Sequence, residues 1–245
     1  MTRLTTCVDA EAAAIRAATE MARHLELAVA ERGIGHVALS GGTTPARTYE
    51  LLARRTQQWT GVELWFADER CVGPEDEQSN YRLVAETLLA QAEIPLERVH
   101  RMEGELGPEE GARSYAATLR AHAATDRERD RGNGVPVLDL ILLGIGPDGH
   151  VASLFPGATT LDADESAVCL GVVDSPKPPP ERISLSLPVL RAARRCLLLA
   201  TGASKADAVN AMLAEPSRHV PASLLRRDRL TVILDDDAAG DRLRR

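Results

Sequence analysis

Hydrophobic residues along the chain follow helical and strand-like patterns that alternate from one end to the other. Over residues 9–32, apolar side chains recur every three or four positions, which predicts an amphipathic helix that ends at Gly33. Residues 137–143 are almost all apolar, which is typical of a parallel strand covered by helices on both faces. Similar patterns predict strands at 36–40, 62–67, 168–173, 182–187, 196–201 and 230–234, and helices at 45–55, 80–90, 108–124 and 204–213.

This alternation of strands and helices is typical of a single α/β domain, here spanning residues 1–245. We predict a Rossmann-like fold, in which a doubly wound, mostly parallel sheet carries helices on both faces. We expect Asn80 to cap the helix at 80–90 and residues 125–134 to form a charged surface loop. In such sheets ligands bind beyond the carboxyl ends of the strands, so the residues that follow each strand are the candidates for function.

The first such turn is Gly41-Gly42-Thr43-Thr44, between a predicted strand and a predicted helix. Two glycines let backbone N–H groups approach an anion closely, and the helix N-terminus adds its dipole. The turn therefore suits a phosphate, although a tight turn without a ligand explains it equally well. It is not a Walker A loop, because the Gly-Lys-Ser/Thr ending is missing.

A second candidate phosphate site is Thr201-Gly202-Ala203-Ser204-Lys205, again where a strand leads into a helix. A lysine near the positive end of a helix dipole is unfavourable unless an anion lies between them. Lys205 is therefore a candidate phosphate ligand, with a solvated surface lysine as the alternative.

Charged residues also follow the strand predicted at 62–67, in the order Asp68-Glu69-Arg70. Two acids and an arginine at a strand's carboxyl end can bind a polar substrate, polarise it or exchange protons with it. A surface cluster of ion pairs is the alternative interpretation.

The loop 144–150 has the spacing Gly-x-Gly-x-x-Gly, but Pro147 interrupts the turn that would open the helix of a dinucleotide site. We interpret it as a glycine-rich loop that presents Asp148 and His150. A histidine with a pKa near 6.5 suits general-base catalysis at neutral pH, and a carboxylate can fix its tautomer. A purely structural histidine remains the alternative.

The composition is that of an ordinary globular protein, with 44% hydrophobic and 27% charged residues and a mean hydropathy of -0.16. A net charge of -7 and a pI of about 5.5 argue against nucleic-acid binding. No apolar run approaches the roughly 20 residues that cross a bilayer, so we expect no membrane contact and a cytoplasmic location. The four cysteines and the histidines show no metal-ligand spacing, so we expect no metal site.

Several of these motifs together resemble the 6-phosphogluconolactonases and their relatives, the glucosamine-6-phosphate deaminases. The resemblance spans about residues 40–205. The motifs that carry it are Ser40-Gly41-Gly42-Thr43-Thr44-Pro45, Asp68-Glu69-Arg70, Ser79-Asn80-Tyr81, Gly146-Pro147-Asp148-Gly149-His150, Pro176-Lys177-Pro178-Pro179, Arg182-Ile183-Ser184 and Gly202 with Lys205.

The resemblance implies hydrolysis of 6-phospho-D-glucono-1,5-lactone to 6-phosphogluconate, the second step of the oxidative pentose phosphate pathway, without a cofactor or a metal. His150, held by Asp148, would take a proton from the attacking water. Arg70 would stabilise the oxyanion or orient the sugar.

The resemblance also implies the residues that bind the substrate. Gly41, Gly42, Thr43 and Lys205 would hold the phosphate. Asp68 would bind sugar hydroxyls or support Arg70, and Arg182 would be a weaker phosphate or sugar contact. As partners we expect only this sugar phosphate lactone and other copies of the chain, as a monomer or a small homo-oligomer.

Two alternatives have other functions. The deaminases of the family have a glutamate five residues after the loop histidine, where this chain has Phe155, which favours the lactonase over isomerase or deaminase chemistry. The same fold also serves as a sugar-phosphate sensor in transcriptional repressors. Those carry an N-terminal pair of DNA-binding helices, whereas this chain reaches its glycine turn after one predicted helix.

Overall fold

The computed structural model describes residues 2–55, 59–123 and 134–243. Its main sheet has six strands, each parallel to its neighbours, in the order β1-β9-β8-β5-β2-β3. The strands are β1 (Arg3–Cys7), β2 (Gly35–Leu39), β3 (Val62–Phe66), β5 (Leu140–Leu143), β8 (Cys196–Ala200) and β9 (Leu230–Asp235). The prediction of a doubly wound, mostly parallel sheet is confirmed, and the strand order reverses between β2 and β5.

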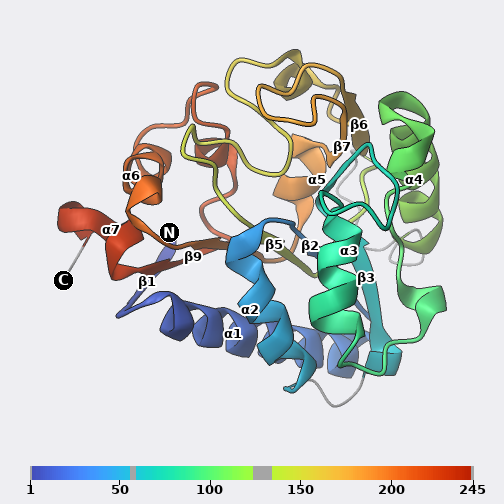
Figure 1. Ribbon diagram of the computed structural model, residues 1–245, viewed down its shortest axis with the longest axis horizontal. Coiled ribbons are helices and arrows are strands. Elements are labelled where there is room, and N and C mark those ends of the chain that lie inside the picture. The colour runs from blue at the N-terminus through green and yellow to red at the C-terminus, as the bar shows by residue number, and fades with distance from the viewer. Residues whose placement is uncertain (1, 56–58, 124–133, 244–245) are drawn as a thin grey trace.

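Helices cover both faces of this sheet (Figure 1). α1 and α2 pack against each other on one face, and α5 lies on the other. The helices are α1 (Ala10–Arg32), α2 (Thr43–Ala53), α3 (Asn80–Val84), α4 (Pro108–Ala123), α5 (Leu187–Ala192), α6 (Ala206–Leu213) and α7 (Asp236–Leu243). Among the described residues, no helix combines the length and the apolar character that a membrane span requires.

The first long helix begins and ends where the sequence pattern predicts. The Asp9 side chain caps α1 by accepting a hydrogen bond from the Ala12 N–H at 2.7 Å. Gly33 ends the helix in the left-handed conformation, with a φ of 77°, and its N–H bonds to the Val29 carbonyl. Local capping chemistry therefore sets both ends of this element.

The start of α3 differs from the prediction by one residue. The cap is Ser79, whose hydroxyl accepts a hydrogen bond from the Arg82 N–H at 3.2 Å, and Asn80 is the first helical residue. This shift matters because it frees the Asn80 side chain for contacts elsewhere. The charged loop predicted at 125–134 lies outside the described residues except for Gly134.

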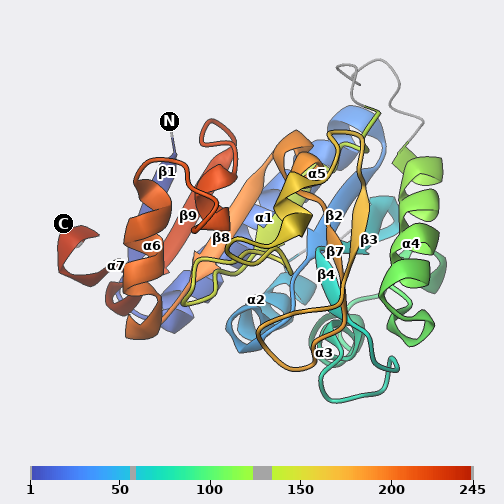
Figure 2. The same cartoon turned by 90° about the horizontal axis from the view of Figure 1, so that it is seen from above.

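A second, three-stranded antiparallel sheet departs from the prediction. It pairs β4 (Asp68–Arg70), β7 (Arg182–Leu185) and β6 (Cys169–Val172) in the order β4-β7-β6, and α4 packs against it (Figure 2). The prediction that the strands at 168–173 and 182–187 belong to the main sheet is wrong. An apolar run identifies a strand but not its neighbour, because the partner is chosen by segments distant in the sequence.

One residue joins the two sheets. The Ala67 N–H donates to the Leu39 carbonyl of β2 at 2.8 Å, which extends the pairing of the main sheet. The Ala67 carbonyl accepts from the Leu185 N–H of β7, also at 2.8 Å. The chain therefore leaves the main sheet at Ala67 and enters the small one, carrying Asp68 and Arg70 over the carboxyl end of β2.

Three further elements were not predicted, namely β1, α5 and α7. β1 is a half-buried edge strand with two polar threonines, and α5 is only 6 residues long, so neither repeats a period often enough to be recognised. Most of the buried hydrophobic side chains form one continuous cluster that includes residues from both sheets.

The half-buried His24 on α1 generates a prediction of acid sensitivity. Burial lowers the pKa of His24 to about 4, and the Arg23 Nη2 lies 3.0 Å from the His24 Nε2, where it donates to a neutral ring. The unfolded chain then takes up this proton first, near pH 6.5, so the free energy of unfolding falls as the pH drops from about 6.5 towards 4. We expect His24 to account for about 1–2 kcal/mol of this loss, allowing for solvent screening of a partly exposed group.

Urea unfolding of the wild type and of His24→Gln at pH 7 and at pH 4 measures this contribution. The variant should lose less stability between the two pH values than the wild type does. An equal loss in both proteins would contradict the prediction.

Candidate active site

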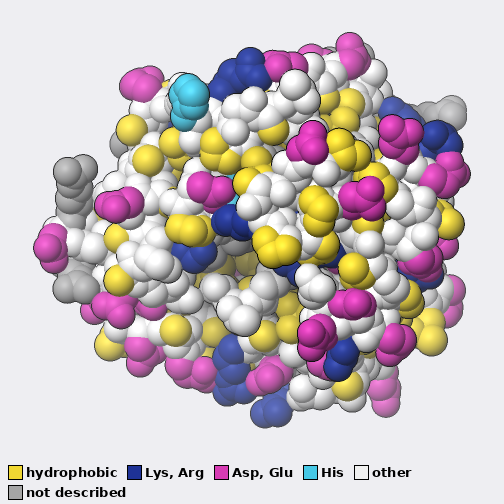
Figure 3. Space-filling model, turned by 45° about the horizontal axis from the view of Figure 1, so that its top comes forward, with side chains coloured by type: hydrophobic (Ala, Val, Ile, Leu, Met, Phe, Trp, Pro, Cys, Tyr) yellow, Lys and Arg dark blue, Asp and Glu magenta, His cyan; other side chains and the backbone are white. Residues whose placement is uncertain are grey.

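A cavity of about 220 Å³ opens at the carboxyl ends of β2 and β5, where the strand order reverses. This is the position at which open α/β sheets bind ligands. Figure 3 shows the hollow near the centre of one face, with Lys and Arg side chains beside it. The lining residues are Ser40, Gly41, Gly42, Thr43, Thr44, Pro45, Asp68, Arg70, Asn80, Gly144, Ile145, Gly146, Pro147, His150, Ala152, Lys177, Arg182, Leu199 and Lys205.

A buried tyrosine, Tyr49, holds the glycine turn after β2 in place. The Tyr49 hydroxyl donates to the Ser40 carbonyl at 2.6 Å and accepts from the Ser40 N–H at 3.0 Å. Gly42 has a φ of 94° and precedes α2, whose first turn has no side-chain cap. The leading N–H groups of an 11-residue helix therefore face the cavity without a side-chain acceptor, as an anion site requires.

The turn also makes a contact that only glycine permits. A Cβ at position 41 would lie 1.7 Å from the Asn80 Oδ1. The Asn80 Nδ2 donates to the Asp68 carbonyl at 2.8 Å and to the Asp68 Oδ1 at 3.2 Å, which fixes the orientation of the amide. Asn80 thus links the glycine turn to the strand that carries Asp68. The sequence analysis predicted only a capping role for Asn80, because no local sequence pattern indicates its close approach to Gly41.

Glu69 is one of the two acids considered as candidates for contact with a substrate, and it does not line the cavity. Its carboxylate is 2% exposed and accepts hydrogen bonds at the start of α3. The donors are the N–H groups of Arg70, Asn80 and Tyr81, at 2.7, 2.7 and 2.8 Å, and the Ser79 hydroxyl at 3.1 Å. Burial raises the pKa of Glu69 and these N–H groups oppose the shift. The residue joins β4 to α3 rigidly.

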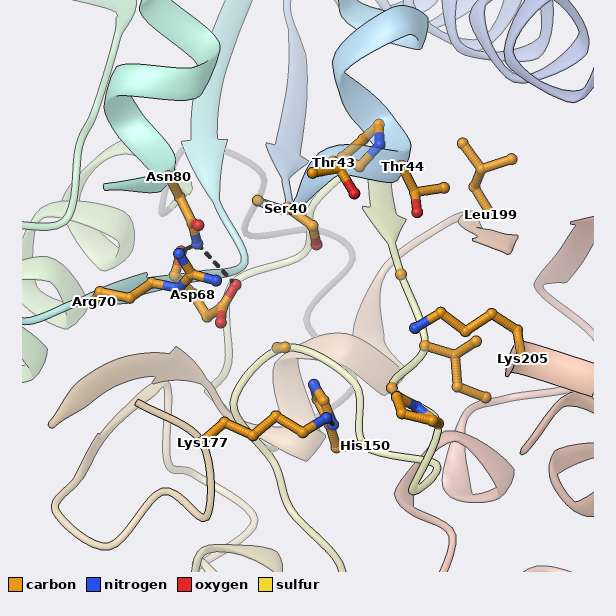
Figure 4. A pocket seen from close by; sticks show the side chains of 18 of the residues that line it. Ser40, Thr43, Thr44, Asp68, Arg70, Asn80, His150, Lys177, Leu199 and Lys205 are labelled. Atoms are coloured by element: carbon orange, nitrogen blue, oxygen red, sulfur yellow. Dashed lines mark hydrogen bonds between the residues drawn. The ribbon is translucent and has the colours of Figure 1, made fainter. Parts of the chain in front are cut away.

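Asp68 and Arg70 do reach the cavity, from one side of it (Figure 4). Asp68 is 6% exposed, and its Oδ2 accepts from the Ser153 hydroxyl at 2.7 Å. The Arg70 Nη1 donates to the Gln78 carbonyl, while its buried Nε has no hydrogen-bond partner among the described residues. The carboxylate and the guanidinium are therefore held in place by neighbouring elements.

The glycine-rich loop brings Asp148 and His150 together. The His150 Nδ1 lies 2.6 Å from the Asp148 Oδ1, which assigns the ring proton to Nδ1 and leaves Nε2 as the free acceptor. Burial lowers the pKa of His150, and the hydrogen bond that the ring donates to Asp148 opposes that shift. The lowered pKa favours the neutral ring, the state that a general base needs. Asp148 itself lies behind the histidine and does not line the cavity.

The loop achieves this geometry through Gly146. A Cβ at that position would lie 2.0 Å from the His150 Nδ1 and 2.3 Å from the Asp148 Oδ1. The Gly146 N–H also bonds to the His150 carbonyl at 2.9 Å, which closes the loop. The glycine spacing noted in the sequence therefore makes room for the Asp–His pair, in keeping with its interpretation as a loop that presents these side chains.

The second predicted phosphate turn contributes only its lysine. Lys205 lines the cavity, and burial lowers its pKa. The Gly202 N–H is instead bonded to both carboxylate oxygens of Asp235 at 3.0 Å. Lys205 ends a short 3₁₀ turn, Ala203–Lys205, that precedes α6, so it does not lie in the first turn of that helix as expected.

Lys177, on the loop between β6 and β7, and Arg182, the first residue of β7, complete the cavity. Arg182 lines it as predicted, but its Nε donates to the Pro179 carbonyl and its Nη2 to the carbonyls of Lys177 and Pro178, each at 3.1 Å. Lys177 was quoted in a motif but not assigned to the site, and the structure places it beside Asp148. Within the described residues, no group of three or more His, Cys, Asp or Glu side chains could hold a metal ion.

A comparison with protein-family models matches residues 8–234 to the family described as glucosamine-6-phosphate isomerases/6-phosphogluconolactonase. The chain belongs to this family. Among curated members, the 6-phosphogluconolactonase of Streptomyces coelicolor is 39% identical, covering 96% of this chain and 91% of its own. The human 6-phosphogluconolactonase is 40% identical over 74% of this chain and 67% of its own.

Solved structures agree with this membership. The 6-phosphogluconolactonase of Trypanosoma cruzi superposes with a TM-score of 0.86 at 25% identity, covering 98% of this chain and 97% of the other. A glucosamine-6-phosphate deaminase superposes with a TM-score of 0.80 at 22% identity, which shows the shared fold alone. The fold predicted from the sequence is therefore the fold of the family.

The tight approach at Gly146 predicts that Gly146→Ala separates Asp148 from His150. We expect at least a tenfold loss of the activity proposed below, because the added methyl group occupies the space of the ring and the carboxylate. Gly73→Ala is the matched control, since a Cβ at that position meets nothing within 4 Å. Circular dichroism should show both variants folded. Full activity in Gly146→Ala would argue against a function for the Asp–His contact.

Proposed function

We propose that the chain hydrolyses 6-phospho-D-glucono-1,5-lactone to 6-phosphogluconate, the second step of the oxidative pentose phosphate pathway. The observation that carries the proposal is the hydrogen bond from the His150 Nδ1 to Asp148, which leaves Nε2 as an acceptor in a cavity that also exposes the N-terminus of α2. Membership of the family and relatives named 6-phosphogluconolactonase support it. We include a cytoplasmic location and one catalytic domain over residues 1–245 in the proposal.

The phosphate of the substrate would bind at the glycine turn. Thr43 is the first residue of α2, and Gly41 and Gly42 precede it. Their backbone N–H groups would bind the phosphate, because the helix dipole favours a negative charge there. Figure 4 shows the hydroxyls of Thr43 and Thr44 and the ammonium of Lys205 on the same side of the cavity. The two hydroxyls would donate uncharged hydrogen bonds to the phosphate, and the ammonium would donate a charge-assisted one.

The lactone carbonyl would then lie near His150, with a water molecule between the His150 Nε2 and C1 of the lactone. The His150 Nε2 takes a proton from this water as its oxygen attacks C1 of the lactone. Asp148 keeps the ring in the required tautomer and stabilises the imidazolium that forms. As the tetrahedral intermediate collapses, the bond from C1 to the ring oxygen breaks, and the imidazolium returns its proton to that oxygen.

The other side of the cavity would bind the sugar and the developing negative charge. Arg70 lines the cavity, and its guanidinium would stabilise the oxyanion on the carbonyl oxygen. Asp68 would accept hydrogen bonds from sugar hydroxyls, since hydrolysis requires no proton to be removed from carbon. Arg182 borders the sugar and mainly supports the loop to which it is bonded.

The alternative within the family is an isomerase or deaminase, and Phe155 argues against it. Its ring centroid lies 4.7 Å from that of His150, at the sequence position where the deaminases have a glutamate. An apolar ring cannot exchange the proton that opens an amino sugar. Incubation with glucosamine 6-phosphate should therefore release no ammonia.

The proposal is tested by the rate of acid release from freshly generated lactone, above the spontaneous rate and with a chelator present. We expect His150→Ala to lower kcat about 10²–10⁴-fold, the contribution of a general base. His219→Ala is the matched control, because that histidine is exposed and does not line the cavity. A folded His150→Ala variant with normal turnover would overturn the mechanism.

A second prediction concerns phosphate binding. Lys205→Ala should raise KM about 10–100-fold with little change in kcat, because a charge-assisted hydrogen bond of roughly 1.5–3 kcal/mol is lost in both the bound ground state and the transition state. Lys205→Arg should recover part of the affinity. A loss confined to kcat would remove Lys205 from the phosphate site.

A further inference from the structure

The chain contains only two lysines, Lys177 and Lys205, and both line the cavity. The proposed function uses Lys205 and leaves Lys177 without a role. Lys177 lies on the loop between β6 and β7, and Figure 4 shows its ammonium pointing towards His150. Every other basic side chain of the sequence, apart from the histidines, is an arginine, so a compact ammonium at this place is distinctive.

The loop holds the main chain of Lys177 firmly. The Ser175 hydroxyl donates to the Lys177 carbonyl at 2.8 Å and accepts from the Lys177 N–H at 3.2 Å. The Arg182 guanidinium, in a residue that is 5% exposed, bonds to the carbonyls of Lys177 and of the two prolines that follow. A buried arginine on β7 therefore fixes where the lysine side chain begins.

The Lys177 side chain then reaches the two atoms that join Asp148 and His150. The Lys177 Nζ lies 3.3 Å from the Asp148 Oδ1 and 3.3 Å from the His150 Nδ1. An ammonium only donates, and the Nδ1 already donates to Asp148, so the two nitrogens share one acceptor oxygen. When the ring takes up a second proton, two positive groups stand in contact.

We propose that Lys177 is a positioning residue that keeps His150 neutral and keeps Asp148 ionised behind it. The inference rests on the proposed function, in which His150 is the base. Lys177 would also make the imidazolium a stronger acid once it has formed, which favours return of the proton to the leaving oxygen. It acts through the histidine and needs no contact with the lactone.

The other groups around His150 shift the pKa of its ring in different directions. Asp148 on the same loop and Asp68 on β4 favour the charged ring, while burial beside the Phe155 ring disfavours it. Lys177 lowers the pKa of the ring and so opposes both carboxylates. Without it, burial alone would oppose the two acids, and His150 would hold its proton at a higher pH.

Titration of the ring by nitrogen NMR of the uniformly labelled full chain tests the proposal, with His150→Gln to assign the signals. We expect Lys177→Met to raise the titration midpoint of His150 by about 0.5–1 pH unit, and Lys177→Arg to leave it within a few tenths. Lys177→Gln provides a second neutral variant. Lys205→Met is the matched control, and should move the midpoint by less than half as much.

Because the titration needs no substrate, it separates this inference from the proposed function. An unchanged midpoint in both neutral variants would overturn the inference, whatever the lactonase activity. So would a higher KM with an unchanged midpoint, which would make Lys177 a substrate ligand. In the expected case, the acidic limb of the pH profile of kcat moves upward with the midpoint measured by NMR.

Discussion

Ala67 bonds to two sheets through its two backbone groups, and the geometry of the site depends on this junction. Its N–H continues the pairing of β3 with β2, and its carbonyl accepts from Leu185 in the antiparallel sheet. The strand that enters the small sheet therefore starts at the carboxyl edge of the large one. Asp68 and Arg70 follow at once, so they face the glycine turn and His150 across the cavity.

Buried polar contacts then set the spacing within the cavity. The carboxylate of Glu69 fixes the start of α3, and this places Asn80 between Gly41 and Asp68. Such a buried acid is costly unless it is fully hydrogen-bonded, and here each oxygen accepts from two donors. The polar side chains that line the cavity are held in place by buried residues such as Glu69, whose own hydrogen bonds are all made within the protein.

His150 is also held by residues on the side of the ring away from its free Nε2. Gly146 makes room for the ring and the carboxylate, and Asp148 fixes the tautomer. Lys177, held through Arg182, adds a positive charge on the side away from the free Nε2. The free Nε2 is therefore left towards the cavity, while Asp148 on the same loop and Lys177 on the loop between β6 and β7 contact the opposite side of the ring.

The sequence by itself determined the elements with strong local signals. The period of apolar residues, Asp9 and Gly33 define α1, and the strand-end glycines marked the turn at Gly41 and the loop of His150. It also gave the residues Asp68, Arg70, Arg182 and Lys205 that line the cavity. Only the tertiary structure decided that β4, β6 and β7 form their own sheet, that Glu69 turns away from the cavity, and that Lys177 meets Asp148. These depend on contacts between segments far apart in the chain, and local periodicity carries no information about such partners.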